Sequence, residues 1–598
     1  MWMLLVLACP PPDESKESTP VVQDDSCTHP VWTGILPFPS NALATRDAAT
    51  VTGLELNIPQ EIMPLTKDGE PAVDAAQLAG LDGFSRLAPV VVALDGGSDG
   101  AAYSTVSEDS NAPIFLMDLT DNHIVRSRLA VTNGGKTLVL WPDRALEPNH
   151  LHATVLRKDL PTTGCFSAGP DYEASKAAGD AFAAEIAQAE AAAQSLGVDP
   201  AVVIPFTTRS LEQEEQTVDA LAAAMPGLID GDSMVVEEVV DCAVGEKSGY
   251  CGDGVGFVLT GHVVMPKWQT SDGPFELDAS RAPIQQGTED LDFWLLVPET
   301  ARETAAPVMV VQHGLGGDKE SMLGIGREFV RAGYAAIAID AVVHGSRPHS
   351  GNTTSAFFGI DFDRWHVETA RDNLRQTSSD HLGLLEALAD HAPDGIWSEG
   401  FELNLEDRSY FGISLGGIIG ASSCPLNPTL DRCVLNVPGG RLVEIVRANG
   451  AYSALMNIFF DPNEGQQEIE LFSALAQTVV DEGDPAIAAA RVVQRSPVRP
   501  LLVQEAIHDT TVYNQTTEVM VRSIGLPLLE PELEAINGLE LEPAPAVENL
   551  ATPDGMFTAG LTQFNEEHSF FGGGSAEGQR ALHQAITFLQ TERIETSE

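Results

Sequence analysis

The chain has 598 residues, 43% of them hydrophobic, which is enough for two domains with sizeable cores. It carries 33 Lys and Arg against 87 Asp and Glu, a formal net charge of −54 at pH 7. A field of that sign repels nucleic acid and anionic membrane surfaces, and no run reaches the roughly 18–20 apolar residues of a membrane-spanning helix. These properties argue against a nucleic-acid-binding protein and an integral membrane protein.

The first predicted feature is at the N-terminus, where Val6-Leu7-Ala8-Cys9 resembles a bacterial lipobox, in which the cysteine is lipidated after cleavage. Residues 10–25 are rich in Pro, Ser and Glu and predict a disordered tether. No Lys or Arg precedes Cys9 and the apolar stretch is short, so a ragged apolar terminus is the alternative. We expect residues 1–26 to be a lipoprotein-type signal and tether of an exported protein, either a lipoprotein of the outer membrane or cell surface or a secreted protein.

The cysteines support export. Setting Cys9 aside leaves six, an even number. Two pairs are close enough in sequence to close short loops and the third follows by elimination: Cys242 with Cys251, Cys424 with Cys433, and Cys27 with Cys165. Disulfides fit an oxidising compartment, whereas buried free thiols are the alternative. The sequence does not decide the connectivity.

Residues 27–234 form the first predicted domain, in which β-prone runs are separated by turn-forming Gly, Asp and Asn. The pattern favours an antiparallel sandwich, and the domain is expected to be mainly β. The runs are 88–94, 113–117, 137–141, 152–156 and 201–208. The alanine-rich stretch from Glu173 to Leu196 predicts one helix, with a role in packing.

Residues 235–598 form the second predicted domain. From about Phe293 apolar runs alternate with helical patterns, which predicts a mostly parallel sheet with helices on both faces. The expected strands are 307–312, 334–340, 408–411, 433–437 and 500–504, and the expected long helix is 363–392.

A glycine-rich loop, His313-Gly314-Leu315-Gly316-Gly317, follows the apolar run 307–312. Such a loop leaves backbone N–H groups free to bind a developing oxyanion, whereas a plain glycine-rich turn is the alternative. We expect the N–H groups of Leu315 and Leu415 to be the two donors, with His313 and Gly314 supporting the loop.

The segment Gly412-Ile413-Ser414-Leu415-Gly416 matches G-x-S-x-G. It lies between a β-prone run and the small apolar residues of a buried helix start, which is the context of the turn that raises a nucleophilic serine above an α/β-hydrolase sheet. Glycine is required for a steric reason at 412 and 416, because a side chain at either position would clash across so tight a turn. Ser414 is therefore the predicted nucleophile.

The segment 439–496 separates two expected strands and predicts an inserted cap or lid over the serine. It contains the apolar run 452–460 and a helical stretch from Gln467. Its apolar residues either line an acyl pocket or form a small core within the lid.

A serine nucleophile needs a base and an orienting carboxylate, and this fold has them in the chain order serine, acid, histidine. Ala506, Asp509 and Val512 follow the expected strand 500–504 with the spacing of many hydrolases, so Asp509 is the predicted acid. Glu505 is the alternative, although it lies closer to the strand end.

Three histidines follow Ser414. His583 falls within the expected C-terminal helix and His508 is adjacent in sequence to the predicted acid. His568 lies in a polar loop between the last strand and the last helix, where the histidine of this fold belongs. The predicted triad is Ser414, Asp509 and His568.

With these motifs the chain resembles the bacterial virulence-factor lipases, which are large exported lipases and lysophospholipases. In the first domain the resemblance lies in LPFPSN at 36–41, LELNIP at 54–59 and LDGFS at 81–85, and in the second in the His313 loop and the Ser414 turn. Ile413 departs from the family, where a histidine is common, and this leaves substrate preference in question. The resemblance implies a carboxylic-ester hydrolase that acts on lipids and is often surface-anchored.

We therefore expect an exported serine ester hydrolase of lipase or lysophospholipase type that forms an acyl-enzyme on lipid or other ester substrates. No spacing in the sequence predicts a metal site or a cofactor, and no nucleic-acid partner is expected. Two alternatives are a peptidase with the same triad and a non-catalytic surface-binding protein that retains the fold. The oligomeric state and the role of the first domain are not determined by the sequence.

Overall fold

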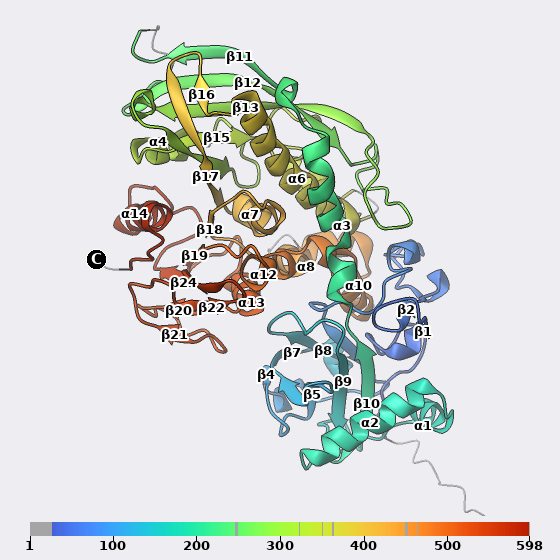
Figure 1. Ribbon diagram of the computed structural model, residues 1–598. Helices are drawn as coiled ribbons and strands as arrows, with labels where there is room; N and C mark the ends of the chain where they lie inside the picture. The colour runs from blue at the N-terminus through green and yellow to red at the C-terminus, as the bar shows by residue number, and fades with distance from the viewer. Residues whose placement is uncertain are drawn as a thin grey trace, which may run out of the picture.

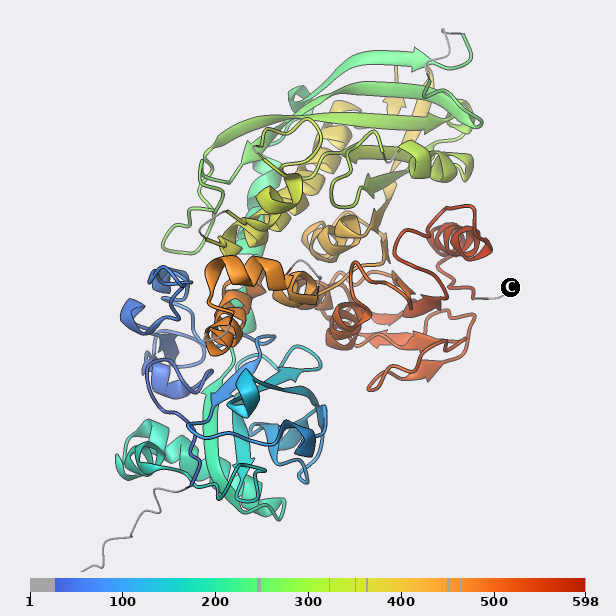
Figure 2. The ribbon, with the colours of Figure 1, turned by 180° about the vertical axis from the view of Figure 1, so that it is seen from behind.

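The computed structural model describes residues 27–244, 249–321, 323–349, 351–361, 364–448, 452–462 and 465–596. Residues 1–26, with Cys9 and the expected tether, lie outside the described residues. Figures 1 and 2 show an N-terminal β-rich part, a second part built on a large sheet, and helices between the two. Among the residues that the structure describes, no helix combines the length and apolar character needed to cross a bilayer.

The N-terminal part contains two four-stranded antiparallel sheets, in the orders β10-β9-β5-β6 and β3-β8-β7-β4. Their strands are β3 (Val90–Ala93), β4 (Val106–Ser107), β5 (Ile114–Asp118), β6 (His123–Val125), β7 (Ser127–Thr132), β8 (Thr137–Pro142), β9 (Leu151–Arg157) and β10 (Pro200–Thr207). Both sheets contribute to one apolar core, which includes Phe115 and Leu140. The antiparallel arrangement predicted from the β-prone runs is confirmed.

The prediction of one helix from Glu173 to Leu196 is wrong. The structure has two helices, α1 (Pro170–Ala177) and α2 (Ala181–Ser195). Gly179 lies between them with a φ of +69°, and the Asp180 side chain caps α2 by accepting a hydrogen bond from the Ala183 amide. A left-handed glycine followed by an N-cap residue ends one helix and begins another, and this local chemistry outweighs the helix propensity of the alanines.

The second part is built on a sheet with the order β11-β12-β13-β15-β14-β17-β18-β19-β24-β20-β21. All pairs from β15 to β21 are parallel, whereas β11, β12, β13 and β15 pair antiparallel. The strands are β11 (Met234–Asp241), β12 (Val255–Lys267), β13 (Gly287–Pro298), β14 (Ala306–Gln312), β15 (Ala335–Ile339), β17 (Phe401–Ile413), β18 (Arg432–Asn436), β19 (Leu501–Ala506), β20 (Leu528–Leu529), β21 (Leu541–Glu542) and β24 (Ala559–Phe564).

Helices cover both faces of this sheet, as two separate apolar clusters show. One cluster holds side chains of α6 (Val367–His391), α7 (Leu415–Leu426) and α13 (Asn514–Ile524), and the other holds side chains of α4 (Leu323–Arg331) and α14 (Ala576–Thr591). The chain therefore has an α/β-hydrolase fold preceded by a mainly β region, as predicted. Strands β11 and β12 were not among the predicted elements.

The insertion between β18 and β19 is helical. Its helices are α8 (Leu442–Ala448), α9 (Tyr452–Phe459), α10 (Gln466–Val480), α11 (Pro485–Ala488) and α12 (Ala490–Gln494). Figure 2 shows α10 between the N-terminal sheets and the large sheet, and α10 contacts both β3 and α6. Phe472 and Leu475 of α10 belong to the same apolar cluster as the N-terminal sheets. The apolar face of α10 therefore extends the N-terminal core and does not form a separate core within the insertion.

The six cysteines among the described residues form three disulfides, Cys27–Cys165, Cys242–Cys251 and Cys424–Cys433. This is the pairing that short loops and elimination suggested. Cys27–Cys165 links the start of the described N-terminal part to the loop after β9.

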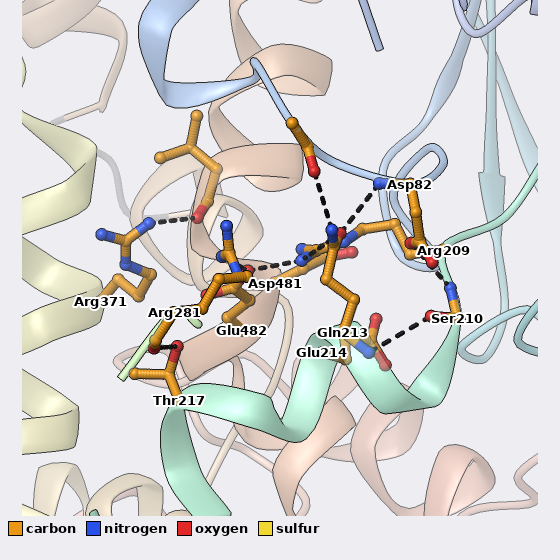
Figure 3. Close-up of polar contacts among 12 residues, drawn as sticks. Asp82, Arg209, Ser210, Gln213, Glu214, Thr217, Arg281, Arg371, Asp481 and Glu482 are labelled. Carbon is orange, nitrogen blue, oxygen red and sulfur yellow. Dashed lines mark hydrogen bonds and ion pairs between the residues drawn. The ribbon is translucent and has the colours of Figure 1, made fainter. Parts of the chain in front are cut away.

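A buried ionic cluster joins the N-terminal part to the hydrolase part (Figure 3). Glu482, which follows α10, is 5% exposed and forms ion pairs with Arg209, Arg281 and Arg375. Arg209 follows β10 of the N-terminal part, whereas Arg375 lies on α6 of the hydrolase part. Burial by itself raises the pKa of Glu482, but the three guanidinium charges outweigh it and hold that pKa well below its usual range.

We expect Glu482→Gln to lower the free energy of unfolding by about 3–5 kcal/mol, because it leaves buried guanidinium groups without a counter-charge. Urea denaturation at pH 7 measures this. Because the folded pKa of Glu482 is lowered, its contribution is present above the unfolded value of 4.5 and is lost as the pH falls below it. Glu577→Gln is the matched control, since its pair with Arg580 on α14 is partly exposed and worth at most about 1 kcal/mol. Equal, small effects of the two variants would contradict the expectation.

Candidate active site

Ser414 occupies a strained turn between β17 and α7. Its backbone has φ +57° and ψ −119°, a conformation that residues with a side chain rarely adopt. The Ser414 amide donates to the carbonyl oxygen of Asn436 at 2.9 Å, and the Ser414 carbonyl accepts from the Ile418 amide at 3.0 Å. Hydrogen bonds on both sides thus hold the residue in this conformation.

The glycines of the motif are required by close backbone approach. A β-carbon at Gly412 would lie 2.2 Å from the carbonyl oxygen of Gly416, and one at Gly416 would lie 2.3 Å from the carbonyl oxygen of Gln312. Both distances are far below van der Waals contact with rigid backbone atoms. The steric reason inferred from the sequence therefore applies at both positions, and the turn can form only with glycine there.

Asp509, His568 and Ser414 form a continuous chain of hydrogen bonds. His568 Nδ1 donates to Asp509 Oδ2 at 2.6 Å, and the Ser414 hydroxyl donates to His568 Nε2 at 2.8 Å. The other carboxylate oxygen of Asp509 accepts from the amides of Thr511 and Val512 at 2.8 and 2.9 Å. These amides fix the carboxylate, the carboxylate fixes the ring, and the ring presents an unprotonated nitrogen to the serine.

The alternative acid and the other two histidines lie elsewhere. Glu505 is buried and its Oε2 accepts from Gln563 Nε2 at 3.0 Å. His508 Nε2 contacts Asn565 Oδ1 at 2.8 Å, and His583 is on the exposed face of α14. The structure thus brings together the three residues chosen from the sequence and none of the three that were set aside.

The His313 loop lies beside the serine. A β-carbon at Gly314 would lie 3.2 Å from the β-carbon of Ser414. His313 is fully buried: the Ala341 amide donates to its Nε2 at 3.1 Å, and its Nδ1 donates to the Gly314 carbonyl at 2.9 Å. Burial lowers the pKa of His313, so the ring is neutral and holds the loop through these two bonds.

The two predicted oxyanion donors directly follow the two residues of this contact in the chain. Leu415 is the first residue of α7, where a backbone N–H has no acceptor within the helix and carries part of the positive end of the helix dipole. Leu315 directly follows Gly314. Such a pair of N–H groups beside a serine can stabilise the negative oxygen of a tetrahedral intermediate.

The sequence did not indicate the backbone groups that support the site. The Asn436 carbonyl and the amides of Thr511 and Val512 carry no signal in their residue types, because every residue offers the same backbone groups. The adjacency of β17 and β18 in the sheet brings the Asn436 carbonyl to Ser414, whereas the amides of Thr511 and Val512 reach Asp509 within one local turn. A group of side chains able to hold a metal ion occurs in the N-terminal part, at Asp118, Asp121 and His150.

Solved structures with a similar fold include an acetyl xylan esterase from Thermoanaerobacterium sp. JW/SL YS485, with 14% identity, 64% of this chain and 94% of that chain covered, and a TM-score of 0.40. An acetyl xylan esterase from Paenibacillus sp. R4 has 15% identity, coverage of 62% and 93%, and a TM-score of 0.36. An acylaminoacyl peptidase from Pyrococcus horikoshii has 13% identity, coverage of 57% and 42%, and a TM-score of 0.33. No family model and no curated protein matches the chain. Similarities this distant assign no activity to this chain.

Proposed function

We propose that the chain is a serine ester hydrolase with Ser414 as nucleophile, His568 as general base and Asp509 as the acid that orients it. The observation that carries the proposal is the unbroken chain of hydrogen bonds from Asp509 through His568 to Ser414, with distances of 2.6 and 2.8 Å. Hydrogen-bonded residues in this order, at a strained strand-to-helix turn, are the arrangement by which a serine is activated.

In the proposed reaction the Ser414 oxygen attacks the ester carbonyl carbon while its proton passes to His568 Nε2. The N–H groups of Leu315 and Leu415 bind the negative oxygen of the tetrahedral intermediate. His568 then gives the proton to the leaving alcohol, and an acyl-enzyme remains. A water molecule, deprotonated by His568, attacks this ester, and collapse of the second intermediate returns the proton to Ser414 and releases the carboxylic acid.

For the substrate we propose a lipid ester of lipase or lysophospholipase type, on the basis of the sequence motifs shared with the virulence-factor lipases. A cavity of about 1060 Å³ offers room for a large substrate, and its lining residues do not include Ser414, Asp509 or His568. Leu455 and Ile458 of α9, in the proposed lid 439–496, line it together with Val343. Val343 precedes His344, whose ring centroid is 5.1 Å from that of His313 beside the serine.

The test is active-site labelling followed by a substrate panel. A fluorophosphonate probe is expected to label the full chain at Ser414, located by peptide mass spectrometry, which separates an enzyme from a non-catalytic binding protein. p-Nitrophenyl esters of increasing acyl length and lysophospholipids are then compared with peptide amides. Preferential cleavage of long-chain esters supports the lipase assignment. Preferential cleavage of amides would show that the protein is a peptidase.

We also propose that the protein is exported and anchored through a lipidated Cys9, outside the described residues. Its charge of −54 does not attract it to anionic lipid, so a covalent lipid is the expected source of attachment. Cys9→Ser is expected to move the protein from the membrane fraction to the soluble fraction with ester hydrolysis unchanged. An unchanged membrane fraction, or a mature N-terminus mapped elsewhere by mass spectrometry, would contradict this proposal alone.

A further inference from the structure

Asp118, His150 and His152, which can bind a metal, converge at one end of β5 and β9, the inner strands of the N-terminal sheet β10-β9-β5-β6. Asp118 is the last residue of β5 and lies directly opposite His152 of β9. Directly opposite residues of an antiparallel pair point to the same face of the sheet. His150 is two residues before His152, so the alternation of an extended chain places it on that face as well.

The ligand atoms are at distances that suit one metal ion. His150 Nδ1 is 2.8 Å from Asp118 Oδ2 and 4.0 Å from Asp121 Oδ2, and His152 Nε2 is 3.5 Å from Asp118 Oδ2. Ligand atoms on one zinc ion, with bonds of about 2.0–2.2 Å, are separated by roughly 3–3.5 Å. The ligand atoms of Asp118, Asp121 and His150 all lie within 4.8 Å of one another, and His152 Nε2 is within reach of the same Asp118 oxygen.

His152 provides an independent indication of a missing partner. Its side chain is fully buried, and its Nδ1 contacts the His150 carbonyl at 3.2 Å, so that nitrogen carries the ring proton. The other nitrogen, Nε2, is then a bare acceptor, and it has no hydrogen-bond partner. The oxygen at 3.5 Å belongs to the Asp118 carboxylate and is also an acceptor. Two buried acceptors that face each other are unfavourable unless a cation lies between them.

We propose that Asp118, Asp121, His150 and His152 bind a divalent transition-metal ion, with Zn²⁺ as the best match. Two imidazole nitrogens and two carboxylate oxygens suit the tetrahedral coordination of zinc better than the all-oxygen preference of Ca²⁺ or Mg²⁺. Binding replaces the hydrogen bond from His150 Nδ1 to Asp118: Nδ1 becomes a metal ligand, and the proton of the neutral ring moves to Nε2.

The groups around the four ligands already hold them in the orientation that binding needs. Asp118 Oδ1 accepts from the amides of Thr120 and Asp121 at 2.8 and 3.1 Å, which leaves Oδ2 for the metal. The Nδ1–H group of His152 donates a hydrogen bond to the His150 carbonyl, as the second ring nitrogen of a metal-binding histidine commonly does. The Asp121 side chain is 60% exposed and that of His150 is 21% exposed, so an ion can enter from solvent on their side.

The role that follows is structural. The ion would tie the turn after β5, which holds Asp121, to the start of β9. His150 also exchanges backbone contacts with Thr208: its amide donates to Thr208 Oγ1, and its carbonyl accepts from the Thr208 amide, both at 3.0 Å. Thr208 precedes Arg209, the N-terminal member of the Glu482 cluster. Metal binding is therefore expected to stabilise the segment that attaches the first domain to the second.

The experiment uses the full chain without a histidine tag, treated with a chelator and then titrated with Co²⁺, whose visible absorption reports tetrahedral coordination. Zn²⁺ is expected to displace the cobalt, and native mass spectrometry is expected to find one ion per chain. Zn²⁺ is also expected to raise the Tm relative to the protein in EDTA.

Single variants assign the ligands. His152→Gln and Asp118→Asn are each expected to weaken Co²⁺ affinity more than tenfold, and so is His150→Gln, whose partly exposed ring makes it the variant least able to impair folding. His262→Gln is the matched control: its Nδ1 also contacts a carboxylate, Glu237, at 3.0 Å, but on the surface of another sheet. It is expected to bind cobalt like the wild type.

Two results would overturn the proposal: no binding of Co²⁺ or Zn²⁺ by the wild-type chain at micromolar concentrations, or binding that persists in both His150→Gln and His152→Gln. The site is independent of the proposed esterase, since none of its residues belongs to the Ser414 site. His150→Gln is therefore expected to leave ester hydrolysis unchanged, so the metal site and the esterase can be tested separately.

Discussion

Ser414→Ala is expected to lower the rate of ester hydrolysis by about 10⁶-fold while leaving the fold intact. Alanine keeps the β-carbon, so the strained backbone at φ +57° is no worse than in the wild type. What is lost is the hydroxyl oxygen 2.8 Å from His568 Nε2, and with it the acyl-enzyme route. Initial rates with a p-nitrophenyl ester, together with the Tm of both proteins, measure the effect.

Ser569→Ala is the matched control for this experiment. Ser569 is exposed and adjacent in sequence to His568, so its replacement tests whether loss of any hydroxyl near the histidine matters. It is expected to change the rate by no more than a few-fold. Turnover close to the wild-type value in Ser414→Ala would rule out Ser414 as the nucleophile.

Asp509→Asn is expected to reduce the rate by about 10⁴-fold, the size of the loss in comparable triads. In the wild type, two backbone amides donate to Asp509 Oδ1, and His568 Nδ1 donates to Oδ2. In the variant, the atom at the Oδ2 position must still accept that hydrogen bond. If the asparagine NH₂ group takes that position it donates a hydrogen bond instead, which favours the wrong tautomer and removes the proton acceptor from His568 Nε2. The ratio kcat/KM as a function of pH, compared with the wild type, measures the loss.

Glu505→Gln replaces the alternative acid, which lies near the end of β19, and is expected to change the rate of ester hydrolysis only slightly. Burial raises the pKa of Glu505 to about 7, and Gln563 donates to its Oε2 at 3.0 Å, a bond that a glutamine oxygen can also accept. Because the folded pKa is raised, wild-type stability falls as the pH rises from 4.5 towards 8. The variant lacks this loss, so its Tm at pH 8 is expected to exceed that of the wild type. If Glu505→Gln abolished ester hydrolysis and Asp509→Asn did not, Glu505 would be the acid of the triad in place of Asp509.

The local chemistry of the sequence was sufficient to predict the turn at Ser414. The contact at Gly412, 2.2 Å from the Gly416 carbonyl oxygen, arises within the strand, turn and helix. The contact at Gly416, 2.3 Å from the Gln312 carbonyl oxygen, is with the neighbouring strand β14. The choice of His568 over His508 and His583 needed only the chain order of the fold and the distinction between loop and helix. The apolar runs predicted the parallel strands because such strands are buried on both faces.

Other features were decided by segments that are distant in the chain. The antiparallel strands β11 and β12 were missed, and the single helix predicted at 173–196 is broken at Gly179. Whether the insertion's apolar residues form their own core could not be read from the sequence, because α10 packs against strand β3 almost four hundred residues earlier. The Glu482 cluster likewise draws its three arginines from three separate segments.

The amino-acid sequence by itself thus determined the nucleophile turn, the order of the triad residues and the mainly parallel sheet, since each depends on residues close in sequence or on a repeating apolar pattern. Only the tertiary structure decided that the Asn436 carbonyl supports Ser414, where the insertion packs, and that Asp118 faces His152. The reason is that strand pairing and burial are cooperative: register places Asp118 opposite His152, and neither residue carries a local signal of the other.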